Sequence, residues 1–202
     1  YRITASDALG NSVVVPYPDD EQPNFAFFVY DGLPAWTASA RPGVTSPVTY
    51  PPELLGSVPV IHLITTRKSH EDAMSIPNST AGGYWGSDYP WRGTLVYNGE
   101  VYDHVRFRAR GGVWRYSMGK NMWKFDFLRS HDFQAHDDYG RPYDTLWKKL
   151  NFSALIQQGD FLQRGEQGLF EGAGFKLHNL ADNAAPKTHY MHFRIVEQAD
   201  ES

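Results

Sequence analysis

The amino-acid sequence predicts an α+β fold in which a mainly antiparallel β-sheet carries one packed helix and is preceded by a β-rich segment. Apolar and charged side chains alternate over residues 105–110 and 122–127, which is typical of strands with one buried face. The pair Asn98-Gly99 lies between two short apolar runs and favours a type I′ hairpin turn. Apolar residues then recur with a helical period over 166–180. Strands, one main helix and a final strand indicate a layered α+β arrangement.

The composition limits the classes of protein to which this chain can belong. Its 202 residues are 41% hydrophobic and 15% aromatic, which suits one folded domain, or one domain and part of another. A formal net charge of -4 argues against a general nucleic-acid-binding protein, so we expect no nucleic-acid partner. The chain has no cysteine, and no apolar run approaches the length of a membrane span.

The first fifty residues differ from the rest in their turn and proline content. Residues 1–32 contain short extended runs separated by turn residues, and five prolines follow between positions 34 and 52. We expect residues 1–50 to be the end of a β-sandwich-like segment with a proline-rich linker, packing poorly against a domain at 51–202. Because the sequence starts at Tyr1, inside a predicted strand, we also expect a piece of a longer protein.

The domain predicted at 51–202 has recognisable elements in order. Residues 58–65 are almost wholly apolar at first, which is typical of a central strand. The pattern Ser69-His70-Glu71-Asp72 favours a capping box that opens a short helix through Met74. The stretch 129–146 is polar and rich in turn residues, and residues 148–152 and 189–196 predict further strands. The helix at 166–180 contains three glycines, so we expect close packing on the sheet to hold it.

The turn between the two alternating strands is the first candidate site. Arg108 and Arg110 share one face of the first strand, and Gly111 and Gly112 follow them. Glycine lets the backbone approach an anion closely, and guanidinium groups bind phosphate oxygens in pairs. The alternative is a twisted hairpin whose arginines are solvated or paired with acids such as Asp126.

The histidine and acidic residues of the turn-rich stretch are a second candidate, for a metal. Their spacing matches no known two-histidine motif, and acidic residues are common in turns. His189 and His192 lie at odd spacing on a predicted strand, so they face opposite sides. We therefore expect no metal site at either place; the residues of the stretch are His131, Asp132, His136, Asp137 and Asp138.

The basic turn and its strands carry a resemblance to a known family. The segments Arg108-Ala109-Arg110-Gly111-Gly112 and Gly119-Lys120-Asn121-Met122-Trp123-Lys124-Phe125 resemble the signature of the CotH-type (spore-coat protein H) family of atypical protein kinase-like proteins. That family carries an R-x-R-G segment, a short loop and a lysine-containing strand. The likeness covers roughly residues 55–197, about seventy per cent of the chain. Many members have two adjacent lysines where this chain has Gly119-Lys120.

The resemblance implies the small lobe of a kinase, a five-stranded antiparallel sheet with one packed helix. It implies ATP and Mg²⁺ as cofactors, a protein hydroxyl as substrate, and a secreted or cell-surface location. Lys124 is implied as the phosphate contact because a strand fixes its geometry, and Lys120 is the second choice. Glu166 is implied as the helix carboxylate that pairs with this lysine, on the same side of the sheet, and Glu171 is the second choice. The catalytic carboxylate and Mg²⁺ ligands follow this region in the family, so we expect no catalytic residue here.

A different class of function fits the aromatic loop at 78–91. Four aromatic side chains in such a loop suit stacking on a glycan or contact with a surface-layer partner. The chain is then a non-catalytic extracellular binding or structural module. The residues of this stacking platform are Tyr84, Trp85, Tyr89 and Trp91.

Overall fold

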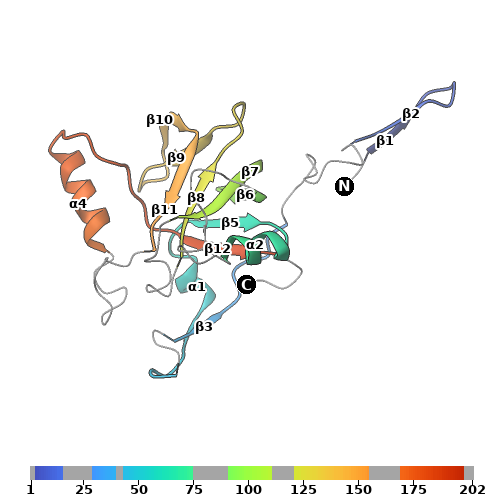
Figure 1. The fold of residues 1–202 in the computed structure, drawn as a ribbon. Coiled ribbons are helices and arrows are strands. Elements are labelled where there is room, and N and C mark those ends of the chain that lie inside the picture. Colours follow the sequence, from blue (N-terminus) through green and yellow to red (C-terminus); the bar gives the residue numbers. More distant parts are fainter. Residues whose placement is uncertain are drawn as a thin grey trace, which may run out of the picture.

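A six-stranded mixed β-sheet forms the centre of the protein (Figure 1). The computed structural model describes residues 3–15, 29–39, 43–74, 91–110, 121–154 and 169–197. Neighbouring strands of the sheet are antiparallel except for β12, which pairs parallel to β5. The prediction of a mainly antiparallel, β-rich α+β fold is therefore confirmed. The strand order is β11 (Lys149–Phe152), β8 (Met122–Asp126), β7 (Glu100–Arg110), β6 (Trp91–Tyr97), β5 (Val60–Ile64) and β12 (His192–Val196).

One face of this sheet is apolar and carries the core. The expected alternation is confirmed on β7 and β8, because Phe107 and Phe125 lie opposite each other and are fully buried. On the neighbouring strands β5 and β6, Leu63 pairs with Leu95 in the same buried layer. Burial of these side chains stabilises the sheet by roughly 1.5–3 kcal/mol each. The hairpin between β6 and β7 turns at Asn98 and Gly99, whose φ angles of 51° and 80° suit a type I′ turn.

The helix that packs on the apolar face is α2 (Arg67–Met74). Its Ala73 is 2% exposed and belongs to the same core cluster as the sheet residues. The helix begins earlier than predicted, because the Thr66 hydroxyl accepts a hydrogen bond from the backbone N–H of Ser69 at 3.1 Å and so acts as the N-terminal cap. In the middle of α2, His70 Nδ1 lies 2.6 Å from a carboxylate oxygen of Glu197. This contact joins α2 to the chain that follows β12.

The polar stretch predicted as turn-rich contains a hairpin, formed by β9 (Phe133–His136) and β10 (Pro142–Trp147). Phe133 is 3% exposed and stacks on Phe127 with 5.1 Å between ring centroids. The hairpin therefore covers part of the apolar face. A single aromatic anchor at the start of a polar strand is a weak sequence signal, and this is why the polar composition pointed to turns alone.

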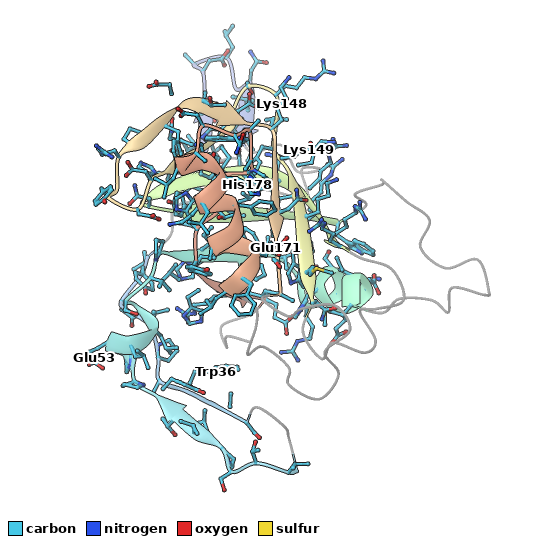
Figure 2. The ribbon with its side chains drawn as sticks, turned by 90° about the vertical axis from the view of Figure 1, so that its left-hand side faces the viewer. Trp36, Glu53, Lys148, Lys149, Glu171 and His178 are labelled. Atoms are coloured by element: carbon cyan, nitrogen blue, oxygen red, sulfur yellow. The ribbon has the colours of Figure 1, made fainter. Side chains whose placement is uncertain are left out.

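Helix α4 (Leu169–Leu180) is present as predicted, but the expected packing on the sheet is not found. Its only buried residue is Gly172, and Leu169, Phe170, Leu177 and Leu180 are 57–83% exposed. The helix stands outside the sheet, on the side of β11 (Figures 1 and 2). The physical reason is that α2 and Phe133 already occupy the apolar face. The following strand is shorter than predicted and begins at His192.

The N-terminal region forms two separate hairpins. The first, β1 (Ile3–Ser6) with β2 (Ser12–Val15), lies apart from the sheet, and every residue of β1 is exposed (Figure 1). The second is β3 (Trp36–Ala38) with β4 (Val48–Tyr50), followed by the short helix α1 (Pro52–Leu55). Between them, the half-exposed Tyr30 ring meets His62 of β5 edge-on at 5.1 Å. The predicted domain boundary at residue 50 stays a prediction. Phe25 and Phe27, two aromatic residues of the extended run predicted before residue 32, lie outside the described residues.

Candidate functional site

The second face of the sheet gathers positive charge across four strands. Side chains of paired residues lie on the same face of a sheet, so the strand register defines which residues meet. Arg92 of β6 pairs with Arg106 of β7, and Arg108 of β7 pairs with Lys124 of β8. Together with two further cations, these residues form what we call the cationic face: Arg92, Arg106, Arg108, Arg110, Lys124 and Lys149.

The cationic face is open to solvent over much of its extent. Arg92, Arg110 and Lys149 are exposed, whereas Arg108 and Lys124 are half-buried. Figure 2 shows Lys149 on the edge strand beside Lys148, with Glu171 and His178 on α4. Long basic side chains lay their methylene stems on the sheet and present the charged head to water. The arrangement therefore offers several ammonium and guanidinium groups to an anion from solution.

One acid lies among these cations on the described part of the face. Asp126 pairs with Arg106 in the register and forms an ion pair with its guanidinium. The carboxylate side chain is only 12% exposed, so it is committed to this partner. Like charges directly opposite each other on adjacent strands are destabilising. Arg108 lies opposite Lys124 and Arg92 lies opposite Arg106, so two such pairs stand on this face.

The far end of the same face is polar but buried. Arg194 of β12 pairs with His62 of β5, and its Nη1 donates toward His62 Nε2 at 3.4 Å. Burial, and then the charges of Arg194 and His192, lower the pKa of His62 to about 4. A neutral His62 accepts a hydrogen bond from arginine, so geometry and charge state agree. This end of the face is a packed structural layer, in contrast to the exposed cations over β6 to β11.

The structure brings together three of the residues that the sequence singled out. Lys124, Arg108 and Arg110 all lie on the cationic face, with Lys124 between Arg108 and Asn151 of the neighbouring strands. The other four predicted contacts, Lys120, Gly111, Gly112 and Glu166, lie outside the described residues.

The structure also places Glu171, the second choice for the helix carboxylate, and Trp91 of the predicted stacking platform. Glu171 accepts a hydrogen bond from the Ser153 hydroxyl at 3.2 Å, so its carboxylate is directed at the chain after β11. Trp91 is half-buried and packs against the core cluster, on the face opposite the cations. Tyr84, Trp85 and Tyr89 lie outside the described residues.

Sequence reasoning missed two residues of the cationic face. Arg92 and Lys149 join the cationic face only through strand register, which no local pattern reveals. The histidine and acidic residues of 131–138 have separate partners, and within the described ranges no group of three or more metal-binding side chains is placed to hold an ion. His131 Nε2, for example, lies 3.0 Å from Glu100. Asp138 contacts His189, which is 51 residues away in the sequence, at 3.0 Å.

Comparison with known proteins gives no relative for this chain. No family model, no curated protein and no solved structure matches it. Among the described residues, no helix is long and apolar enough to cross a membrane.

Proposed function

We propose that this chain is the N-terminal, small-lobe part of a secreted or cell-surface CotH-type protein kinase. Joined to a C-terminal lobe, it would transfer the γ-phosphate of ATP to a protein hydroxyl. The observation that supports the proposal most is the placement of Lys124 on β8, an inner strand of the sheet, opposite Arg108. The basic segment that carries the family signature precedes Lys124 in the sequence. A lysine on a strand is a feature that a nucleotide-binding lobe requires. The six-stranded mixed sheet and the exposed helix α4 differ from the five-stranded antiparallel sheet with one packed helix that the resemblance implies.

The residues of the cationic face fit the phosphate chain of a nucleotide. A lysine ammonium acts as a compact point charge, whereas a guanidinium binds two oxygens of one phosphate at once. Lys124 and Arg108 would hold phosphate oxygens, and Arg110 would meet them from the end of β7. Bound Mg²⁺ would neutralise charge on the phosphates, with its protein ligands expected from the C-terminal lobe.

The test is nucleotide binding by wild type and by two lysine variants. Lys124→Ala removes the strand lysine, and Lys149→Ala removes a second lysine of the same face on the edge strand as a matched control. By calorimetry with MgATP, we expect Lys124→Ala to weaken binding roughly tenfold or more, because a charged hydrogen bond is lost. Lys149→Ala should change affinity by less than about threefold, as an exposed charge contributes weakly.

The kinase proposal also demands an activity in the full-length protein. Wild type should phosphorylate a protein substrate with ATP, and Lys124→Ala should not. If both proteins are equally active, Lys124 has no part in the mechanism. If wild type binds no nucleotide but does retain a glycan, the binding-module function replaces the kinase proposal.

A further inference from the structure

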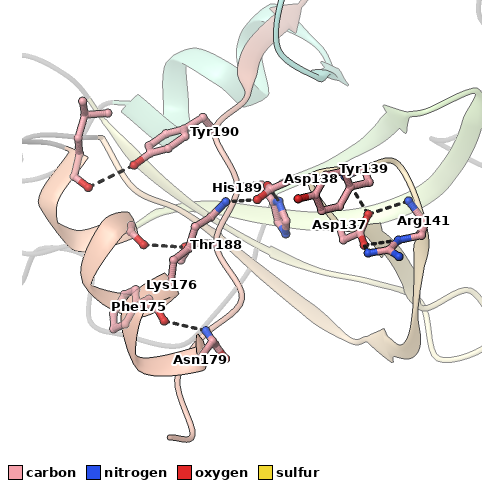
Figure 3. Close-up of polar contacts among 12 residues, drawn as sticks. Asp137, Asp138, Tyr139, Arg141, Phe175, Lys176, Asn179, Thr188, His189 and Tyr190 are labelled. Carbon is pink, nitrogen blue, oxygen red and sulfur yellow. Dashed lines mark hydrogen bonds and ion pairs between the residues drawn. The ribbon is translucent and has the colours of Figure 1, made fainter. Parts of the chain in front are cut away.

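Helix α4 and the chain after it form one self-contained unit, residues 169–190, which we call the α4 arm. The Tyr190 hydroxyl donates to the Leu169 carbonyl at 3.2 Å, and the Asn179 side-chain amide donates to the Phe175 carbonyl (Figure 3). The same amide also donates to the Pro186 carbonyl. A Cβ placed on Gly172 would lie 2.8 Å from the Tyr190 hydroxyl, so the returning segment touches the helix backbone there. The arm is thus held together by its own contacts.

The contacts that hold the arm against the rest of the protein are polar. No apolar side chain of α4 is buried, so the helix gains little from the hydrophobic effect. Isolated helices of about twelve residues are marginally stable in water, and their position depends on tertiary contacts. The place of the arm therefore depends on a small number of hydrogen bonds and ion pairs.

Two of these polar contacts meet at Asp138, in the turn between β9 and β10. Its two carboxylate oxygens bind different parts of the arm, one the Lys176 ammonium of α4 and the other His189 Nδ1 at 3.0 Å (Figure 3). His189 Nε2 in turn lies 3.0 Å from the Tyr143 hydroxyl of β10, which donates to it when Nδ1–H donates to Asp138. The hydrogen bond between Ser153 and Glu171 is a further contact to the arm.

The neighbouring acid, Asp137, has a different role although it has the same chemistry. Its carboxylate accepts from the Arg141 side chain at 2.7 Å and from the backbone N–H groups of Tyr139 and Arg141 at 2.9 Å. All these partners lie within the β9–β10 turn. Asp137 therefore stabilises the turn, whereas Asp138 contacts the arm. Substitution of each aspartate by asparagine gives a matched pair of variants.

We propose that Asp138 is a latch that holds the α4 arm against the β9–β10 hairpin, and that the arm swings away as a unit when the latch is open. The hairpin side of the latch is rigid because Phe133 anchors β9 in the core. The arm side has no such anchor, because Gly172 is the only residue of α4 that is fully buried. The lowered pKa of Asp138, caused first by Lys176 and then by His189, shows that the charged carboxylate is the form that these contacts stabilise.

Because the chain has no cysteine, two introduced cysteines can carry spin labels that report the distance between the arm and the hairpin. Spin labels are attached at His178→Cys on α4 and Thr145→Cys on β10, two exposed positions. We compare the distance distribution in the otherwise wild-type protein with that in Asp138→Asn and Asp137→Asn. Asp138→Asn should broaden the distribution toward longer distances, while Asp137→Asn should keep it narrow.

Hydrogen exchange separates movement of the arm from general unfolding. In Asp138→Asn, exchange over residues 173–180 should rise roughly fivefold, the effect of losing exposed ion pairs, while the strands of the six-stranded sheet keep their wild-type rates. A distribution that stays narrow in Asp138→Asn overturns the proposal, and so does equal broadening in both variants. A uniform rise of exchange in the sheet also overturns it. Because Lys124→Ala should leave the distribution narrow, a failure of the nucleotide-binding proposal is distinguishable from a failure of the latch.

Discussion

Helices α2 and α4 show that an apolar sequence and a buried position are different properties. The shorter helix, α2, is mostly polar, yet its Ala73 enters the core and His70 is tied to Glu197. The longer helix, α4, has a clear apolar repeat, and its leucines lie in solvent. A helix therefore packs on the sheet only where the apolar face of the sheet is still uncovered. The body of the sheet and α2 are held by burial, whereas the α4 arm is held by polar contacts.

The sharpest test of this comparison places a carboxylate in each helix. Ala73→Glu buries an unpaired charge in the core, so the free energy of unfolding should fall by about 3 kcal/mol or more. Ala173→Glu is the matched change at an exposed position of α4. It should alter the free energy of unfolding by less than about 0.5 kcal/mol. Urea unfolding of the two variants measures both values. Equal losses would show that α4 is buried to the same degree as α2.

A second test uses pH, because the two regions titrate differently. The folded pKa of His62, about 4, lies below the ordinary 6.5, so the unfolded chain takes up the proton first. His62 therefore costs the sheet no stability above pH 6.5 and destabilises it increasingly as the pH falls from 6.5 to 4. The pKa of Asp138 is lowered from 3.8, so its stabilisation is present above that value and is lost only as the pH falls further.

The measurement for this second test is urea unfolding across the pH range in wild type and His62→Gln. The advantage of wild type over the variant should be constant above pH 6.5 and shrink between 6.5 and 4. A wild-type advantage that is independent of pH would contradict the assignment of His62 as a buried neutral residue.

The smallest expected effect separates two glycines of α4. Gly174 has no atom within 4 Å of a built Cβ, so Gly174→Ala should stabilise the helix by about 0.5–1 kcal/mol. Gly172→Ala has the same gain in helix propensity, but its Cβ would press on the Tyr190 hydroxyl at 2.8 Å. We expect no net stabilisation there, measured by exchange over residues 173–180. Equal stabilisation by both alanines would show that Tyr190 does not pack against α4.

Local patterns predicted the elements of the sheet well. The alternation on β7 and β8 placed Lys124 and Arg108 opposite the aromatic residues, and Asn98-Gly99 gave the hairpin turn. These succeed because side-chain period and turn chemistry are properties of neighbouring residues. The packing of α4, the β9–β10 hairpin and the Asp138 latch were not predicted. Each depends on residues far apart in the chain, such as Asp138 and His189, whose meeting no spacing reveals.

The amino-acid pattern alone was enough to predict strands β5 to β8, the buried faces of β7 and β8, and the side of the sheet on which Lys124, Arg108 and Arg110 lie. Those features follow from covalent geometry and from the transfer of apolar side chains out of water. Three features came from long-range packing: β12 pairs parallel to β5 at one edge of the sheet, α2 rather than α4 covers the core, and Arg92 and Lys149 join the cationic face. Those outcomes depend on competition for one apolar surface and on strand register, which are set by the whole chain at once.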